Sequence, residues 1–172
     1  MSKSTLVRAL AGAALLAAAT AASAMTATVT VNAKTNSFTG GTAADTGIDL
    51  FAGQTLRVSV PTDELWDNSW TNPTYLSDAD GHSFQTFTYG SFTANIGALV
   101  GEIGSGPLFL VGTSYDAAAN AAGDLKLFFW DTDAINNTGS VVATVTAVPE
   151  PATFAMLGVG LAVVGLARRR KV

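Results

Sequence analysis

The central part of the chain alternates apolar and polar side chains with a period of two, the pattern of β-strands that bury one face. In residues 26–31 threonine alternates with alanine and valine, and in residues 55–60 Leu56, Val58 and Val60 fall on one face. Later segments rich in β-branched and aromatic side chains predict further strands at residues 84–92, 125–130 and 140–147.

Turn-forming sequences separate these predicted strands. Glycine, aspartate and proline cluster at residues 40–41, 80–81, 104–107 and 122–124. Many short strands joined by such turns favour an all-β fold, namely an antiparallel β-sandwich of the jelly-roll type. The chain has no cysteine, and residues 25–147 form a predicted extracytoplasmic domain that is long enough to bury a core without disulfides.

The first 24 residues have the three parts of a secretory signal peptide. Lys3 and Arg8 form a positive start, an alanine- and leucine-rich stretch follows, and Ala-Ser-Ala at residues 22–24 is a small-x-small cleavage pattern. We expect the mature protein to begin near Met25 and to lie outside the cytoplasm. The alternative is a retained helical anchor, but the apolar stretch is short for a membrane span.

Residues 148–172 consist of three parts in a defined order. The first part is Val148, Pro149, Glu150 and Pro151, where two prolines favour an extended chain. Residues 152–167 carry no charge, and as a transmembrane helix of roughly 24 Å they would need some local thinning of the bilayer. The basic tail at 168–172 is expected to stay cytoplasmic because of Arg168, Arg169, Arg170 and Lys171.

This order of triplet, apolar helix and basic end resembles the PEP-CTERM sorting signal of Gram-negative bacteria. The resemblance implies that a membrane enzyme, exosortase, processes the protein while the C-terminal helix anchors it transiently with the C-terminus in the cytoplasm. It also implies association with exopolysaccharide and biofilm matrix, so that the mature domain would be periplasmic, at the cell surface or in the extracellular matrix. An ordinary single-span anchor is the alternative, and it does not explain the triplet.

The distribution of charge limits what the domain can bind. The formal net charge is −4, but residues 25–148 hold twelve acidic and only three basic side chains. Such a surface repels nucleic acid and attracts cations, so we expect no nucleic-acid partner. The chain has one histidine, which excludes sites that need two imidazoles within one chain. No pair of acidic residues forms a recognisable catalytic motif, so we expect no enzyme activity.

One loop concentrates side chains that bind hard cations. After the strand that ends at Trp130, four oxygen-bearing side chains fall within seven residues, and they are Asp131, Asp133, Asn136 and Asn137. Ca²⁺ takes six to eight oxygen ligands from carboxylates, amides and backbone carbonyls, and this loop can supply several of them. The alternative is that these residues form turns by hydrogen-bonding their own backbone, which is common in aspartate- and asparagine-rich hairpin loops.

Several segments in order resemble the calcium-dependent galactophilic bacterial lectins and their galactose-binding-like relatives. These segments are Gly-Ala-Leu-Val-Gly-Glu-Ile-Gly at 97–104, residues 109–113, residues 121–127 and the loop that begins at Asp131. The resemblance implies that Asp131, Asn136 and Asn137 hold a Ca²⁺ ion that coordinates sugar hydroxyls, with Asp133 as an additional ligand. This loop is shorter than the family's loop, and the family's threonine ligand has no clear counterpart here.

Sugar contacts are expected from two further regions. The lectin resemblance implies that a histidine and a glutamine contact the sugar, and His82 and Gln85 lie in the corresponding region. Trp66 and Trp70 lie in a polar segment that predicts a loop, so either ring could stack on a sugar. The alternative is that at least one of these tryptophans belongs to the core, because large aromatic side chains are usually buried.

Two functions therefore remain open from the sequence. The first is an exported carbohydrate-binding module that depends on Ca²⁺ and is associated with the cell surface or with exopolysaccharide. The second is a non-catalytic structural or adhesive matrix protein with the same fold and no sugar site. A cation cage beside an open surface would distinguish the first function from the second.

Overall fold

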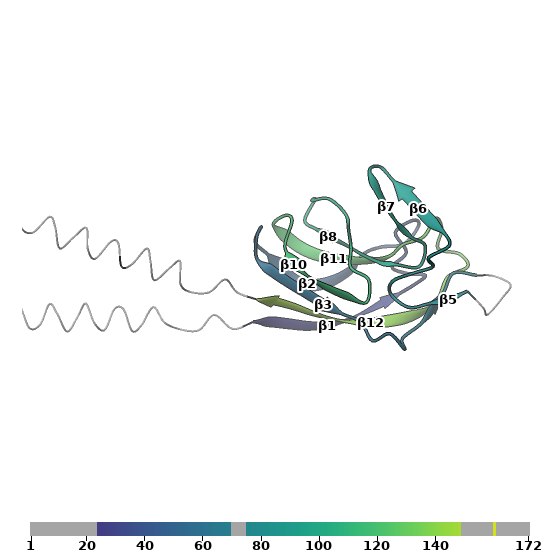
Figure 1. Ribbon diagram of the computed structural model, residues 1–172, viewed down its shortest axis with the longest axis horizontal. Helices are drawn as coiled ribbons and strands as arrows, with labels where there is room; N and C mark the ends of the chain where they lie inside the picture. The colour runs from purple at the N-terminus through teal and green to yellow at the C-terminus, as the bar shows by residue number, and fades with distance from the viewer. Residues whose placement is uncertain (1–23, 70–74, 149–159, 161–172) are drawn as a thin grey trace, which may run out of the picture. The chain divides into compact units, whose positions relative to one another are not determined.

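Two antiparallel sheets and a separate hairpin make up the described part of this protein (Figure 1). The structure is a computed structural model that describes residues 24–69, 75–148 and 160. Residues Ala24–Val148 form one compact unit. The strands of this unit, in chain order, are β1 (Met25–Asn32), β2 (Ala44–Leu50), β3 (Thr55–Ser59), β4 (Trp66–Asp67), β5 (Leu76–Ser77), β6 (Thr86–Tyr89), β7 (Phe92–Asn95), β8 (Leu99–Ile103), β9 (Phe109–Leu110), β10 (Ser114–Ala118), β11 (Gly123–Phe129) and β12 (Thr138–Val148).

Several predictions concern residues that the structure does not describe. They are the signal peptide before Ala24, Trp70, the Pro-Glu-Pro triplet at 149–151, the basic tail, and the apolar helix apart from Gly160. Within the described ranges, no helix has the length and apolar character needed to cross a membrane.

The first sheet is built around β12, which is hydrogen-bonded along both edges. The strand order is β10-β3-β12-β4-β5, and β1 also pairs with β12. The whole of β1 pairs in register, from Met25 opposite Ala147 to Asn32 opposite Ser140. Every second residue in this part of β12 is buried, and these residues are Val141, Ala143, Val145 and Ala147. The predicted strands at 26–31, 55–60 and 140–147 are confirmed in this sheet.

The second sheet has the strand order β2-β11-β8-β9. It contains the predicted strand at 125–130 as β11, together with β2, which the sequence analysis did not predict. Asp45, Gly47 and Asp49 are residue types typical of turns. The sequence of this segment therefore did not indicate that buried and exposed positions alternate along it. In the structure these three residues face solvent, whereas the residues between and beside them are buried, namely Ala44, Thr46, Ile48 and Leu50. The expectation of an antiparallel β-sandwich is confirmed.

The main core lies between the two sheets, and Trp66 on β4 is part of it. The indole ring meets the ring of Phe129 edge to face, with 4.6 Å between the centroids. The Nε1–H group of Trp66 donates to the carbonyl oxygen of Gly97 at 2.7 Å and also approaches the carbonyl oxygen of Asp78 at 3.2 Å. Burial of this ring is tolerated because its one polar group is hydrogen-bonded.

A second, smaller core connects the β6–β7 hairpin to the end of β11. Trp130 is fully buried there, and its ring centroid lies 4.6–5.0 Å from those of Phe38, Phe87 and Phe92. The expectation of a single strand over 84–92 is wrong, because the chain reverses between β6 and β7 at Gly90. Gly90 has a φ of 59°, a left-handed conformation that glycine adopts at no steric cost.

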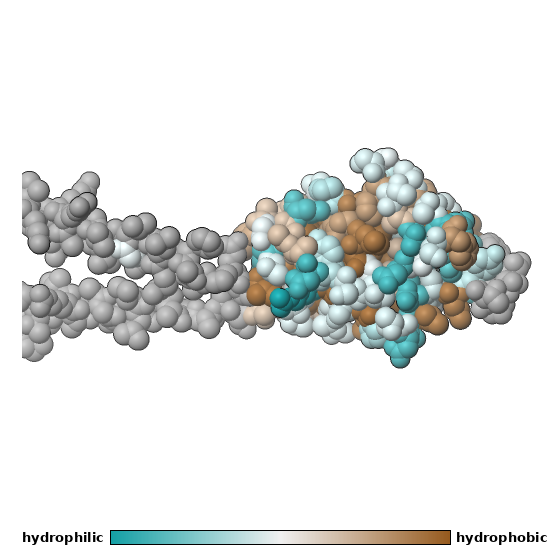
Figure 2. Space-filling view, in the orientation of Figure 1, coloured by the Kyte–Doolittle hydropathy of each residue, from teal (hydrophilic) through white to brown (hydrophobic). Residues whose placement is uncertain are grey.

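Exposed apolar side chains are spread over several segments of the domain. The visible face in Figure 2 accordingly shows apolar residues interspersed with hydrophilic ones. The large exposed apolar residues are Met25, Phe51, Leu65, Tyr75, Leu76, Phe84, Tyr89, Leu110 and Ile135. Among these, Tyr75 and Phe84 form a pair, with ring centroids 6.1 Å apart.

We predict that Trp66→Phe lowers the free energy of unfolding by about 2–4 kcal/mol. The substitution removes the donor for two backbone carbonyls and leaves space beside Phe129. Urea unfolding followed by circular dichroism measures the change. Phe51→Leu is the control, because Phe51 is 79 % exposed and its replacement should leave the stability nearly unchanged. Equal stability of Trp66→Phe and the wild type would contradict the role of Trp66 in the core.

Candidate functional site

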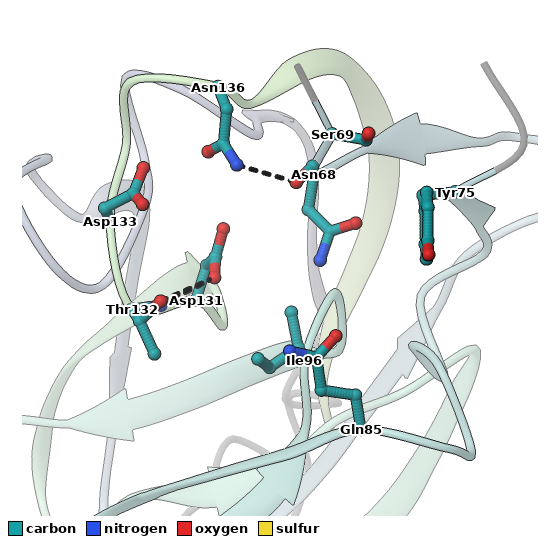
Figure 3. A pocket seen from close by; sticks show the side chains of 9 residues that line it. All are labelled: Asn68, Ser69, Tyr75, Gln85, Ile96, Asp131, Thr132, Asp133 and Asn136. Atoms are coloured by element: carbon teal, nitrogen blue, oxygen red, sulfur yellow. Dashed lines mark hydrogen bonds between the residues drawn. The ribbon is translucent and has the colours of Figure 1, made fainter. Parts of the chain in front are cut away.

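A pocket of about 290 Å³ opens beside the loop that follows β11 (Figure 3). Its lining residues come from separate parts of the chain, and they are Asn68, Ser69, Tyr75, Gln85, Ile96, Asp131, Thr132, Asp133 and Asn136. The β11–β12 loop forms one wall, and segments around β4, β5, β6 and β7 form the other. Asp131, Asp133, Asn136 and Gln85, which were selected from the sequence, therefore line one pocket.

Asp131 reaches this pocket because the backbone before it is fixed on both sides. The Trp130 amide donates to the carbonyl oxygen of Ala98 at 2.9 Å, and the Trp130 carbonyl accepts from the amide of Gly97 at 2.8 Å. With the Trp130 side chain in the second core, the next side chain projects toward the opposite side, as in a strand. Asp131 is itself only 4 % exposed.

Burial makes the Asp131 carboxylate electrostatically unfavourable. The pKa of this carboxyl is raised above its ordinary value mainly by desolvation, and the nearby charge of Asp133 raises it further. Hydrogen bonds from Thr132 and Asn137 act in the opposite direction without offsetting the burial. The backbone amide of Thr132 donates to Asp131 Oδ1 at 2.6 Å. A positive charge in the pocket would relieve the unfavourable burial.

The loop is held against the segment that follows β1. Asn137 donates through Nδ2 to the carbonyl oxygens of Asp133 at 2.8 Å and Ala33 at 3.3 Å. Ser37 Oγ donates to the same Asp133 carbonyl at 3.0 Å. Asp133 Oδ1 accepts from the amide of Ile135 at 2.9 Å, an Asx turn within the loop. Some of the asparagine and aspartate side chains in this loop therefore stabilise the conformation of the loop itself.

Two amide oxygens of the loop have no such partner. Asn136 donates through Nδ2 to the carbonyl oxygen of Asn68 at 2.8 Å, which connects the two walls of the pocket. Among the described residues, neither Asn136 Oδ1 nor Asn137 Oδ1 has a hydrogen-bond partner, although both atoms are buried. A buried acceptor without a partner costs about 1–3 kcal/mol, so its presence calls for an explanation.

The unpaired oxygens are of a kind that a hard cation can bind. Ca²⁺ takes oxygen ligands that include carboxylates and the amide oxygens of asparagine, and both kinds occur within this loop. Within residues 24–69 and 75–148, no group of three or more His, Cys, Asp or Glu side chains is placed to hold a metal ion. A cation at this loop would therefore depend on the amide oxygens of Asn136 and Asn137 in addition to the carboxylates.

Two of the predicted sugar contacts need correction. Trp66 is fully buried in the main core, and its indole nitrogen is bonded to backbone carbonyls, so no face of its ring is available for a ligand. His82 is only 7 % exposed and does not line the pocket. Gln85 is exposed and lines the pocket as expected, whereas Trp70 lies outside the described residues.

The structure adds Asn68 and Tyr75, which the sequence analysis did not select. Asn68 lies in the polar segment that contains Trp66, and Tyr75 directly precedes β5. Figure 3 shows Asn68 between Asn136 and Tyr75 on the wall opposite Asp131. The polar composition around Trp66 indicated a binding segment, but alternation alone did not show which of its side chains face outward.

Comparisons with known proteins find two similarities. Residues 147–171 match the PEP-CTERM protein-sorting motif, so the chain carries that motif at its C-terminal end. Among solved structures, the chain is similar to the N-terminal domain of EclA, described as a PllA-like lectin. The TM-score is 0.53 with 22 % identity, covering 70 % of this chain and 95 % of that one, which shows a lectin-like fold. No curated protein matches this chain.

We predict that Asp131→Asn stabilises the calcium-free protein at neutral pH by a few degrees in melting temperature. A raised pKa means that the folded state binds the proton more tightly than the unfolded state. The contribution of Asp131 to the stability of the wild type is therefore fully present below its unfolded pKa and is lost as the pH rises through the raised pKa. The asparagine keeps an acceptor for the Thr132 amide without the buried charge.

Thermal unfolding in a chelating buffer across this pH range measures the effect. The advantage of Asp131→Asn should shrink as the pH falls through the raised pKa, because folded wild-type Asp131 then takes up a proton and loses its buried charge. Asp63→Asn serves as the control, because it removes an exposed carboxylate that does not line the pocket. A calcium-free Asp131→Asn that is less stable than the wild type at neutral pH would show that the carboxylate is not under strain.

Proposed function

We propose that this protein is an exported, non-catalytic carbohydrate-binding protein whose pocket holds Ca²⁺. Asp131, Asn136 and Asn137 would provide ligands, with Asp133 as an additional one. The single observation that carries this proposal is the pair of unpaired, buried amide oxygens of Asn136 and Asn137 next to a desolvated carboxylate. The lectin-like fold supports the same site, because its β11–β12 loop borders an open pocket.

The residues around the pocket have distinct tasks in this proposal. Bound calcium would supply positive charge and coordination positions for sugar hydroxyls. Asp131 and Asp133 would bind the cation through carboxylate oxygens and thereby be relieved of their mutual repulsion. Gln85 on the opposite wall offers an exposed amide that can hydrogen-bond a sugar hydroxyl. Tyr75, which is 39 % exposed, offers a partly open aromatic ring beside it.

The sorting motif supports the proposed route and location. Export through the inner membrane would follow cleavage of the predicted signal peptide near Ala24. Exosortase would then process the protein at the C-terminal motif, whose matched residues begin at Ala147. The domain would finally reside in the periplasm, at the cell surface or in the exopolysaccharide matrix, where its carbohydrate ligands would also be found.

A structural or adhesive matrix protein without a sugar site is the second candidate. One observation favours it, since Asp133 Oδ1 and Asp131 Oδ1 both accept hydrogen bonds from backbone amides of their own loop. Such hydrogen bonds from aspartate side chains to nearby backbone amides are typical of turns and form without any ligand. Calcium binding without any affinity for carbohydrate, or no calcium binding at all, would favour this candidate.

We predict saturable binding of Ca²⁺ to the domain Ala24–Val148, which forms its own compact unit. Isothermal titration should give a dissociation constant on the order of 10⁻⁴ to 10⁻³ M, as in extracellular calcium modules. Asp131→Asn should strongly weaken binding, because the substitution removes a negative charge and one of the two side-chain oxygens that can bind the cation. Asp63→Asn should bind like the wild type, since its carboxylate is exposed and outside the pocket.

A glycan array with and without Ca²⁺ then separates the two candidate functions. A signal that requires calcium and disappears in Asp131→Asn would support the lectin proposal. Calcium binding with no glycan signal would leave a metal-stabilised matrix protein. If the wild type and Asp131→Asn give the same titration, the loop is not a cation site.

We also predict that replacing Pro149, Glu150 and Pro151 by alanine blocks processing of the C-terminal end. A bacterial host with an active exosortase should convert the wild type to a shorter form, visible by pulse-chase labelling and mass spectrometry. The triple variant should keep its full C-terminal segment and remain in the membrane fraction. Thr153→Ala, which leaves the triplet intact, should be processed normally. A wild type that keeps its full C-terminal segment would favour an ordinary anchor, and processing of the triple variant at the wild-type rate would contradict the role of the triplet.

A further inference from the structure

His82 is buried behind the pocket, yet it bonds to four of the residues that line it. Its backbone amide donates to the carbonyl oxygen of Ile96 at 2.8 Å, and its carbonyl accepts from the amide of Gln85 at 3.2 Å. Its ring nitrogen Nε2 lies 3.2 Å from Asn68 Oδ1 and 3.1 Å from the carbonyl oxygen of Tyr75. One residue thus contacts most of the wall that faces the β11–β12 loop.

The chemistry of these partners assigns the proton on the ring. A backbone carbonyl can only accept a hydrogen bond, so Nε2 of His82 must carry a hydrogen to bond with Tyr75. The same N–H group is shared with the side-chain oxygen of Asn68. The imidazole ring is therefore hydrogen-bonded to two residues of the pocket wall, Asn68 and Tyr75.

The position of the ring is fixed by packing. Its centroid lies 6.0 Å from that of Tyr75 in an edge-to-face arrangement and 5.0 Å from that of Phe84. Gly97 also lies close to the ring, since a Cβ there would be 3.6 Å from His82 Cδ2 and would collide with Ser77 Oγ. Because the ring is buried and packs on these neighbours, its hydrogen bonds hold Asn68 and Tyr75 in defined positions.

Because Asn68 also bonds to Asn136 across the pocket, the position of Asn68 affects the orientation of the Asn136 side chain. The backbone carbonyl of Asn68 accepts from Asn136 Nδ2 at 2.8 Å, which decides how the Asn136 amide is oriented. With its nitrogen committed to Asn68, Asn136 leaves its oxygen on the side of Asp133, as Figure 3 shows. That oxygen is one of the two unpaired buried acceptors of the proposed cation site.

We propose that His82 is a positioning residue for the pocket. It holds Asn68 and Tyr75 from behind, and through Asn68 it orients the amide of Asn136 so that the oxygen is available to a ligand. This role is distinct from the direct sugar contact expected for His82 from the sequence. The part that concerns cation affinity rests on the proposed function, whereas the orientation of Asn136 does not.

Two substitutions separate the ring's hydrogen bonds from its packing. His82→Phe keeps an aromatic ring against Tyr75 and Phe84 but has no donor for Asn68. His82→Gln gives up the ring but retains an N–H donor at similar reach. Val145→Ala is the control for general destabilisation, because Val145 is fully buried in the main core and does not line the pocket.

The first measurement needs no calcium. Two-dimensional NMR in chelating buffer follows the side-chain amide of Asn136, whose hydrogens bond to Asn68. We expect His82→Phe to shift these resonances and to speed their exchange with water, His82→Gln to restore them, and Val145→Ala to leave them unchanged. Unchanged Asn136 resonances in a folded His82→Phe would overturn the proposal.

The second measurement is calcium titration of the same four proteins. Loss of a residue that orients a metal ligand typically weakens metal affinity by about 10- to 100-fold, and we expect this loss in His82→Phe. His82→Gln should recover most of the affinity, and Val145→Ala should lose stability without losing affinity. Equal losses in His82→Phe and Val145→Ala would overturn the positioning role by reducing it to general stability.

The two measurements distinguish failure of this inference from failure of the proposed function. If the wild type binds no calcium but the Asn136 resonances respond to His82→Phe and recover in His82→Gln, the cation site is refuted and the positioning role stands. If calcium binds and His82→Phe changes neither the resonances nor the affinity, the cation site stands and the positioning role is refuted.

Discussion

Burial of two consecutive aromatic side chains in different cores, Phe129 and Trp130, is the interaction on which the rest of the structure depends. Phe129 enters the main core and Trp130 enters the second core, and their backbone is hydrogen-bonded to segments on both sides. Burial of each ring contributes roughly 2 kcal/mol or more. Their fixed backbone determines where Asp131 emerges, so the loop beside the pocket takes its position from both cores.

The loop beside the pocket carries groups that reduce stability. Asp131 is desolvated, and the amide oxygens of Asn136 and Asn137 are buried without partners among the described residues. Folded proteins keep few such groups because each one costs free energy. Their concentration in one tethered loop, beside a pocket with an aromatic ring and an amide on its opposite wall, is the arrangement expected of a binding site whose ligand completes the missing interactions.

Alternation of apolar and polar residues predicted the strands correctly where apolar side chains are buried and polar side chains face solvent. The segments that became β1, β3, β11 and β12 were found in this way. The same reasoning failed at β2, where aspartate and glycine face solvent within a regular strand, and at Gly90, where a reversal divides an apolar segment into a hairpin. The polar composition around Trp66 made this ring a candidate sugar contact, because polar neighbours in the sequence did not show that the ring points into the core.

By itself, the sequence determined the all-β class, the acidic surface, the sorting motif and the composition of the loop from Asp131 to Asn137, because each of these depends on residues that are close together in the chain. Only the tertiary structure decided what faces that loop. Asn68, Tyr75 and Gln85 come from distant segments, and His82 is buried behind them. Local periodicity shows which side of a strand is buried, but contacts between segments far apart in the chain are set by how the two cores pack.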